Sequence, residues 1–284
     1  MDAILSSVRL RQLAESWLNE DQPALDFGAL TSDGIAEAKL FCKQSCVLAG
    51  RPFFDAVFNV LGCKVNWDVK DGDLIEVEEN SKKIVAKISG PCRQILSGER
   101  PALNCLSRCS GVSTSTRRIA DITAAENWSG KVACTRKTTP GFRLVEKYGV
   151  LVGGGDPHRY DLSSMVMLKD NHLDAFGGDY AKAVEKVRKY AGFSMKIEVE
   201  TRNENEALAG ARSDADIIML DNFSPENAKR IAKLIKKDYP HKIVEVSGGV
   251  NASNVHLYCS SDIDVISMGC LTQGYPCIDF SLKL

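Results

Sequence analysis

Six short apolar segments in the second half of the chain are each followed at once by polar residues or glycine. These segments are Val132–Cys134, Met165–Leu168, Ile197–Val199, Ile217–Leu220, Ile243–Val246 and Val265–Met268. They alternate with stretches of helical pattern, such as Tyr180–Tyr190, Asn203–Ala211 and Pro225–Lys237. This alternation predicts a parallel sheet with helical crossovers, which could be a closed barrel or an open doubly wound sheet.

The residues that follow the six segments favour the barrel and locate a candidate site. They include cations, carboxylates and small residues: Thr135-Arg136-Lys137, Lys169-Asp170-Asn171-His172, Glu200, Asp221-Asn222, Ser247-Gly248-Gly249 and Gly269. In an α/β barrel the carboxyl ends of all strands converge on one mouth, where active sites lie. Any one polar residue could simply mark the end of a strand, but buried charges of both signs must pair with one another, with a metal or with a ligand.

The first half of the chain has a different pattern, and 284 residues suffice for one large α/β domain with a smaller companion. Helical patterns cover Ile4–Leu18 and Pro52–Val60, and short β-rich segments lie between residues 38 and 88. Asp71-Gly72 predicts a hairpin turn between two of these segments. A long helical region, Ile95–Thr123, follows, and we expect an interruption near Gly111. The pattern predicts an α+β domain with a small antiparallel sheet.

Composition excludes several classes of protein. The formal net charge of −1 gives no overall field that would attract nucleic acid or an acidic membrane, and no apolar run approaches the roughly 20 residues of a membrane span. The ten cysteines form no Cys-x-x-Cys pair. We therefore expect free thiols in a reducing cytoplasm rather than disulfides or structural zinc.

The residue types at the predicted mouth suit anion binding. Ser247-Gly248-Gly249 and Gly269 expose backbone N–H groups to which a phosphate could bind, although Ser-Gly-Gly also marks ordinary turns. Glu200 and Asp221 are oxygen ligands of the kind that Mg²⁺ prefers. Period-two counting places Lys196, Glu198 and Glu200 on one strand face, which could instead be a buried ion-pair ladder.

Two longer motifs are more specific. The first is Gly130-Lys131-Val132-Ala133-Cys134-Thr135-Arg136-Lys137-Thr138-Thr139-Pro140-Gly141, and the second combines His158-Arg159-Tyr160-Asp161-Leu162 with Met167-Leu168-Lys169-Asp170-Asn171-His172. With Gly98-Glu99-Arg100, Ala102-Leu103-Asn104, Leu220-Asp221-Asn222-Phe223, Ser247-Gly248-Gly249 and Asp279-Phe280-Ser281-Leu282, they closely resemble the quinolinate phosphoribosyltransferase family, especially its eukaryotic members. The resemblance covers nearly the whole chain.

The resemblance implies a fold and an activity. The fold is an N-terminal α+β open-faced sandwich, over residues 1–112, and a C-terminal incomplete barrel of seven strands, over residues 113–274, with the tail at about 275–284 packing back on the first domain. The activity joins the phosphoribosyl group of phosphoribosyl pyrophosphate to quinolinate with decarboxylation, which yields nicotinate mononucleotide, pyrophosphate and CO₂ for de novo NAD synthesis.

The resemblance also implies roles for individual residues. Arg100, Arg136, His158 and Arg159 would bind the two carboxylates of quinolinate. Phosphoribosyl pyrophosphate would contact Thr135, Lys137, Lys169, Glu200, Asp221, Ser247, Gly248, Gly249 and Gly269. Lys137, Lys169, Glu200 and Asp221 would be the catalytic residues, and Glu200 and Asp221 would hold Mg²⁺ directly, through water or through ribose hydroxyls.

The resemblance further implies a cytoplasmic homo-oligomer, with the nucleus as an alternative compartment. A dimer would be the minimum unit and a hexamer the expected assembly, with Arg100 reaching the neighbouring subunit's site. Pro101 departs from the family pattern, and because proline fits the first turn of a helix better than its interior, we expect a helix to begin there.

Three other readings remain. A nicotinate phosphoribosyltransferase would have one carboxylate to bind, whereas four cationic groups suit a diacid. A non-catalytic relative would be expected to lose charged residues at the mouth, whereas every charged residue that the resemblance assigns to the site is present in this sequence. An unrelated barrel enzyme using a Schiff base would need one desolvated lysine rather than lysines beside arginines.

Overall fold

The computed structural model describes residues 2–284, and the chain divides into two compact units. Unit 1 contains the described part of Met1–Arg117, together with Pro140–Gly154 and Tyr275–Leu284. Unit 2 contains Arg118–Thr139 and Gly155–Gly274. Unit 1 thus includes a segment, Pro140–Gly154, that the sequence assigned to the barrel domain, and the domain boundary at residue 112 stays a prediction.

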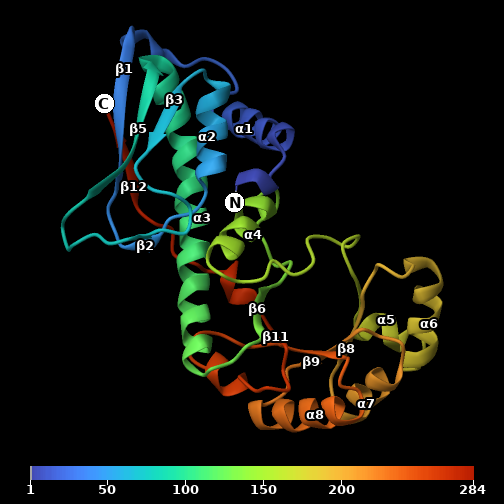
Figure 1. Ribbon diagram of the computed structural model, residues 1–284. Helices are drawn as coiled ribbons and strands as arrows, with labels where there is room; N and C mark the ends of the chain where they lie inside the picture. Colours follow the sequence, from blue (N-terminus) through green and yellow to red (C-terminus); the bar gives the residue numbers. More distant parts are fainter. Residues whose placement is uncertain (1) are drawn as a thin grey trace. The chain divides into compact units, whose positions relative to one another are not determined.

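Unit 1 is built on an antiparallel sheet with strand order β12-β1-β5-β3 (Figure 1). Its strands are β1 (Ile35–Cys42), β3 (Lys64–Trp67), β5 (Lys83–Pro91) and β12 (Phe280–Lys283), and β2 (Cys46–Val47) pairs separately with β4 (Leu74–Ile75). Its helices are α1 (Ser7–Asp21), α2 (Arg51–Val60), α4 (Arg143–Val152) and most of α3 (Cys92–Ala125). The C-terminal strand β12 pairs with β1 from Lys39↔Lys283 to Cys42↔Phe280.

Aromatic side chains of α2 form the centre of unit 1. Phe53, Phe54 and Phe58 are fully buried. The ring of Phe54 lies 5.0 Å from that of Phe58 and 5.2 Å from that of Trp67, while Phe53 meets Tyr148 of α4 edge-on at 5.4 Å. Burial of this large apolar area is the main force that holds the helices to the sheet.

Helix α3 corrects two predictions. It runs without a break from Cys92 to Ala125, so no interruption occurs at Gly111, and Pro101 lies in its interior rather than at its first turn. The glycine has a packing role, because a Cβ at residue 111 would lie 2.1 Å from the carbonyl oxygen of Pro276. The helix around Pro101 tolerates the missing N–H because its flanks bury apolar residues such as Ala102 and Leu103.

The predicted hairpin at Asp71-Gly72 is also wrong, although the turn exists. Gly72 has a φ of +95°, which suits a tight turn. The strands on either side do not pair with each other, because β3 pairs with β5 and β4 pairs with β2. Tertiary pairing therefore overrides the local hairpin signal.

Unit 2 contains a parallel sheet of six strands in the order β6-β11-β10-β9-β8-β7. The strands are β6 (Lys131–Cys134), β7 (Val166–Leu168), β8 (Ile197–Thr201), β9 (Ile217–Asp221), β10 (Ile243–Ser247) and β11 (Val265–Met268). Its helices are α5 (Asp170–Asp174), α6 (Tyr180–Ala191), α7 (Glu204–Arg212) and α8 (Pro225–Asp238), with the last residues of α3. All six apolar segments identified in the sequence form strands.

The sheet ends at β6 and β7, so it stays open, as expected of an incomplete barrel. Seven strands were expected, and the residues described form six. The seventh position holds a single parallel bridge between Ala133 and Asp156. A longer ladder does not form because the backbone N–H of His158 donates to the Asp156 carboxylate, at 2.6 Å, instead of to a neighbouring strand.

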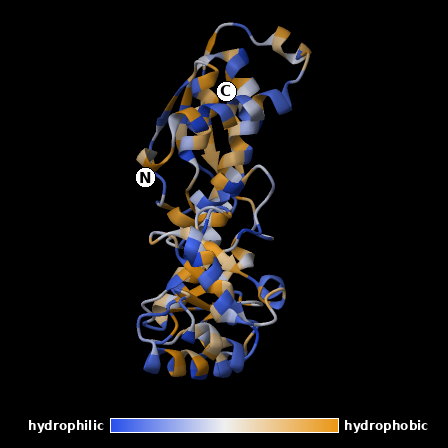
Figure 2. Cartoon of the chain, turned by 90° about the vertical axis from the view of Figure 1, so that its right-hand side faces the viewer, coloured by the Kyte–Doolittle hydropathy of each residue, from blue (hydrophilic) through white to orange (hydrophobic). Residues whose placement is uncertain are grey.

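Helices α6, α7 and α8 pack on one face of the sheet of unit 2. In Figure 2 the helix at the lower end of the view, α8, alternates between hydrophobic and hydrophilic segments. Its buried side chains are Ala228, Ile231, Ala232 and Ile235, spaced as one helical face. The opposite face of the sheet carries side chains that line a cavity.

Candidate active site

A cavity of about 520 Å³ lies in unit 2 at the carboxyl ends of the parallel strands. Twelve of the thirteen residues that the sequence assigned to the site line it: Thr135, Arg136, Lys137, His158, Arg159, Lys169, Glu200, Asp221, Ser247, Gly248, Gly249 and Gly269. The thirteenth, Arg100, is an exposed residue of α3 in unit 1 and is not among the lining residues. Strand direction explains the gathering, because all six strands end at the same edge.

Seven further residues line the cavity and were not assigned to it from the sequence: Cys134, Met167, Met219, Asn222, Glu245, Val250 and Ser267. Met219 and Glu245 each lie two positions before a predicted site residue on the same strand, and Met167 lies two positions before Lys169, which directly follows β7. Side chains two apart share a strand face, so these residues form a deeper layer of the same face. Counting back by two from each strand end would have found them.

The two arginines of the cavity are incompletely compensated. Arg159 is 9% exposed, and burial, together with the charge of Arg136, lowers the pKa of its guanidinium. Its terminal Nη2 points to the sulfur of Met167 at 3.3 Å. The buried Nε of Arg136 has no hydrogen-bond partner in residues 2–284. Arg159 is buried and Arg136 half-buried, and two guanidiniums near each other create a strong local attraction for anions.

The carboxylates of the cavity lie at the ends of neighbouring strands β8 and β9. Glu200 accepts a hydrogen bond from Lys169 Nζ at 2.5 Å. Burial raises the pKa of Asp221, and the nearby charge of Glu200 raises it further. Asn222 Nδ2 donates to Asp221 Oδ2 at 2.6 Å. Glu200 is buried and Asp221 half-buried, and both line the cavity, where two carboxylates are oxygen donors of the kind that a divalent cation prefers.

The loop after β10 is shaped for a close backbone approach. Gly248 and Gly249 both have positive φ, of +91° and +65°. A Cβ on Gly248 would lie 2.3 Å from Asn222 Oδ1 and 2.8 Å from the Asn222 backbone nitrogen. Asn222 in turn donates its backbone N–H to the Ser247 carbonyl at 2.9 Å. Only glycine fits position 248, and the loop leaves its backbone open toward the cavity.

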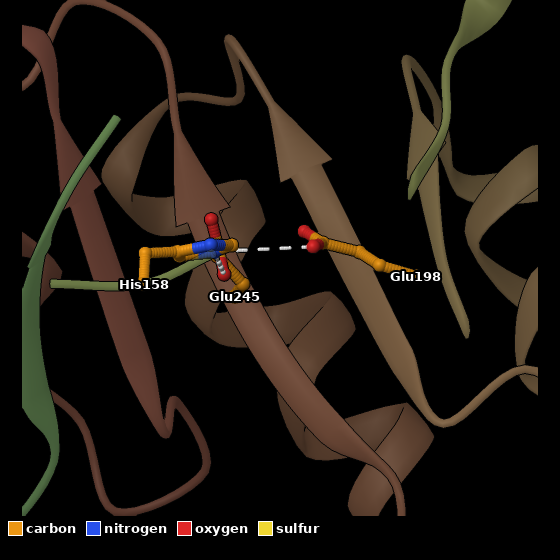
Figure 3. Close-up of side chains that lie close together, drawn as sticks. All are labelled: His158, Glu198 and Glu245. Carbon is orange, nitrogen blue, oxygen red and sulfur yellow. Dashed lines mark hydrogen bonds and ion pairs between the residues drawn. The ribbon is translucent and has the colours of Figure 1, made fainter. Parts of the chain in front are cut away.

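His158 and Glu245, which line the cavity, form a cluster with the fully buried Glu198 (Figure 3). His158 Nε2 lies 2.9 Å from Glu245 Oε2 and 3.9 Å from Glu198 Oε2. Glu198 is fully buried, and neither of its oxygens has a hydrogen-bond partner within residues 2–284. Burial, and next the charge of Glu245, raises the pKa of Glu198 well above its usual value.

The alternative of a buried ion-pair ladder of Lys196, Glu198 and Glu200 along β8 does not match the structure. Lys196 is exposed and precedes the strand, whereas Glu198 and Glu200 are buried. The cation that meets Glu200 is Lys169 from β7's end, not Lys196. Of these side chains, Glu200 lines the cavity and Glu198 is fully buried.

An α/β enzyme with an anion-binding cavity at its strand ends is the class that this fold and site define. The family described as "Quinolinate phosphoribosyl transferase, C-terminal domain" matches residues 112–283, and its N-terminal counterpart matches residues 25–110. The chain therefore belongs to the quinolinate phosphoribosyltransferase family.

Individual relatives agree with this membership. The chain is 50% identical over 283 residues to the "Nicotinate-nucleotide pyrophosphorylase [carboxylating]" of Rattus norvegicus and 48% identical to that of Homo sapiens, in each case covering 99% of this chain and 93% of the relative. The crystal structure of NadC from Streptococcus pyogenes superimposes with a TM-score of 0.89 at 35% identity, over 99% of this chain and 97% of that one.

A second type of phosphoribosyltransferase shares only the fold. The crystal structure of human nicotinic acid phosphoribosyltransferase matches with a TM-score of 0.57 at 14% identity.

Among the residues described, every helix is too short or too polar to cross a lipid bilayer.

Proposed function

We propose that this chain is a decarboxylating quinolinate phosphoribosyltransferase. It transfers the phosphoribosyl group of phosphoribosyl pyrophosphate to quinolinate and releases pyrophosphate and CO₂, so that nicotinate mononucleotide is formed for de novo NAD synthesis. The observation that carries the proposal is the gathering of Arg136, Lys137, Arg159 and Lys169 around a single cavity with a glycine loop at its edge.

Arg136 and Arg159 bind the two adjacent carboxylates of quinolinate. A planar guanidinium matches a carboxylate with two parallel hydrogen bonds. Arg159 is buried near the charge of Arg136, and the Nε of Arg136 has no hydrogen-bond partner among the described residues. His158 borders the same space. Arg100 completes the clamp from a neighbouring subunit, which makes a dimer the minimum unit and a hexamer the expected assembly.

Phosphoribosyl pyrophosphate occupies the part of the cavity lined by the glycine loops. Its 5-phosphate accepts hydrogen bonds from the backbone N–H groups of Ser247, Gly248, Gly249 and Gly269. Thr135 lines the same cavity, and Lys137 and Lys169 face the pyrophosphate.

Glu200 and Asp221 hold Mg²⁺, directly or through water, or bind the ribose hydroxyls. Burial raises the pKa of Asp221 most, and the charge of Glu200 raises it further. A divalent cation held by the two carboxylates would offset their repulsion, which supports this assignment. When bound, Mg²⁺ neutralises part of the charge of the pyrophosphate.

Catalysis rests on charges fixed before the reaction. As pyrophosphate leaves, the anomeric carbon gains positive character, which Glu200 and Asp221 stabilise, while Lys137 and Lys169 stabilise the departing anion. Attack by the ring nitrogen gives a pyridinium. Its positive charge stabilises the carbanion left by the loss of CO₂, so the substrate ring is its own electron sink. The carbanion then takes a proton from water to give nicotinate mononucleotide.

We also propose a cytoplasmic location, with the nucleus as an alternative. All ten cysteines, which lie within the described residues, are free thiols, as suits a reducing compartment.

The test incubates purified protein with phosphoribosyl pyrophosphate, Mg²⁺ and either quinolinate or nicotinate. We expect nicotinate mononucleotide from quinolinate and little or none from nicotinate. Product from nicotinate alone would establish the one-carboxylate enzyme, and a folded protein inactive with both would indicate a non-catalytic relative.

A further inference from the structure

We propose that Glu245 is a positioning residue of this site, which acts through His158 to fix the turn that carries Arg159. The inference deepens the proposed function and rests on it. Glu245 does not need to touch the substrate for this role. It fixes the backbone position from which the side chain of Arg159 extends to the substrate.

The turn before Arg159 is held in an unusual conformation. His158 has a φ of +53°, a region in which a residue with a side chain is strained. The Asp156 carboxylate accepts the His158 backbone N–H at 2.6 Å, and Asp156 itself is joined to β6 by the bridge to Ala133. The surrounding contacts must therefore hold the turn in place.

Both nitrogens of the His158 ring take part. The backbone N–H of Arg159 donates to Nδ1 at 2.7 Å. A nitrogen that accepts cannot carry a proton, so the ring proton is on Nε2, which donates to Glu245 Oε2 at 2.9 Å. The contacts form one chain from Glu245 through the imidazole to the backbone of Arg159, and Figure 3 shows the ring facing Glu245.

The environment makes this contact strong. The side chain of Glu245 is 2% exposed, and that of His158 is 11% exposed. A hydrogen bond to a carboxylate is stronger away from water, and loss of the acceptor would leave a buried N–H unsatisfied. The ring could then turn or change tautomer, and the N–H of Arg159 would lose its acceptor.

A metal ion is the competing explanation, since the ligand atoms of His158, Glu198 and Glu245 lie within 4.8 Å of one another. A neutral imidazole that binds a metal through Nε2 carries its proton on Nδ1. That position faces the N–H of Arg159, so two donors would meet. The hydrogen-bond geometry favours the positioning role.

The test uses three variants with different chemistry. Glu245→Leu removes the acceptor while keeping a similar volume. Glu245→Gln keeps a carbonyl acceptor but loses the charge. Glu198→Leu is the matched control, since it removes a buried carboxylate from the same cluster that lies 3.9 Å from Nε2 and is not hydrogen-bonded to it.

The first measurement is the tautomer of His158, read from ¹⁵N–¹H long-range spectra of the ring and assigned with a His158→Gln variant; the chain has only four histidines. We expect the Nε2–H form in the wild type, Glu245→Gln and Glu198→Leu, and its loss in Glu245→Leu. The second measurement is the Kd of quinolinate by calorimetry. Glu245→Leu should bind about 10- to 100-fold more weakly, the effect of one charge-assisted hydrogen bond, with a much smaller change in KM for phosphoribosyl pyrophosphate.

A wild-type protein that neither binds nor converts quinolinate would refute the proposed function. An active wild type with the Nδ1–H tautomer, or a Glu245→Leu variant that binds quinolinate as the wild type does, would refute the positioning role alone. One zinc ion bound per wild-type chain and lost in Glu245→Leu would replace it with a metal site.

Discussion

Replacing either glycine of the loop after β10 by alanine tests how that loop is built. Gly248 and Gly249 are adjacent and both have positive φ, so each alanine incurs about 1–2 kcal/mol of backbone strain. The space around them differs. A Cβ at 249 meets nothing within 4 Å, whereas at 248 it would lie 2.6 Å from Asn222 Cγ and 2.8 Å from the Asn222 backbone nitrogen.

The two variants should therefore differ in size of effect. Asn222 can rotate its side chain but cannot move its backbone nitrogen without disturbing the end of β9, which adds about 1–3 kcal/mol of overpacking at 248. We expect Gly248→Ala to lower the free energy of unfolding by about 2–5 kcal/mol and Gly249→Ala by about 1–2 kcal/mol.

Urea unfolding of both variants measures these losses, and steady-state kinetics measures KM for phosphoribosyl pyrophosphate. Gly248→Ala should raise this KM more than the KM for quinolinate, because the loop is displaced at the proposed phosphate site. Equal stability of the two variants, or a larger loss in Gly249→Ala, would refute the reasoning from steric space.

Three other variants extend the account. Lys137→Ala should reduce kcat by about 10²- to 10³-fold, the size of losing one electrostatic stabiliser, and near-normal turnover of the folded variant would contradict its role. Asp216→Asn tests a pH effect: burial raises the pKa of Asp216, but hydrogen bonds from Arg188 and the Ile197 N–H outweigh it and leave the pKa lowered. An ionised Asp216 therefore stabilises the fold at a pH above the pKa that the carboxyl has in the unfolded chain, and this stabilisation is lost as the pH falls through the lower pKa of the folded state. The variant should be less stable than the wild type at neutral pH and equally stable at a pH below both pKa values. Thermal unfolding across pH measures the difference. Phe53→Ala, at a fully buried position, should lower the free energy of unfolding by about 3–5 kcal/mol, and a loss below 1 kcal/mol by urea titration would show that the core of unit 1 relaxes around it.

Local pattern in the sequence predicted the elements of unit 2 well. Each segment became a strand, since strands buried on both faces are rich in apolar residues. Two of them, Ile197–Val199 and Ile243–Val246, contain Glu198 and Glu245, which meet His158 in a buried cluster. The polar residues after Leu168, Val199 and Leu220 gather because strand direction is shared, and that is a property of topology that alternation alone predicts.

Long-range packing was not accessible in the same way. Gly111 indicated a helix break, but it is required by the carbonyl of Pro276, which is 165 positions away in the chain and whose approach no local pattern reveals. The interior position of Pro101 and the separate partners of β3 and β4 have the same origin. The polar residues that follow the strands do not include Glu245, which lies within β10, one layer below Ser247.

The central claim is that the cavity at the strand ends of unit 2 binds a dicarboxylate between two arginines. A crystal structure of the protein with quinolinate alone measures this directly. We predict carboxylate oxygens within about 3.2 Å of the guanidinium nitrogens of both Arg136 and Arg159. Quinolinate bound elsewhere, or bound in this cavity with neither guanidinium in contact, would contradict the account.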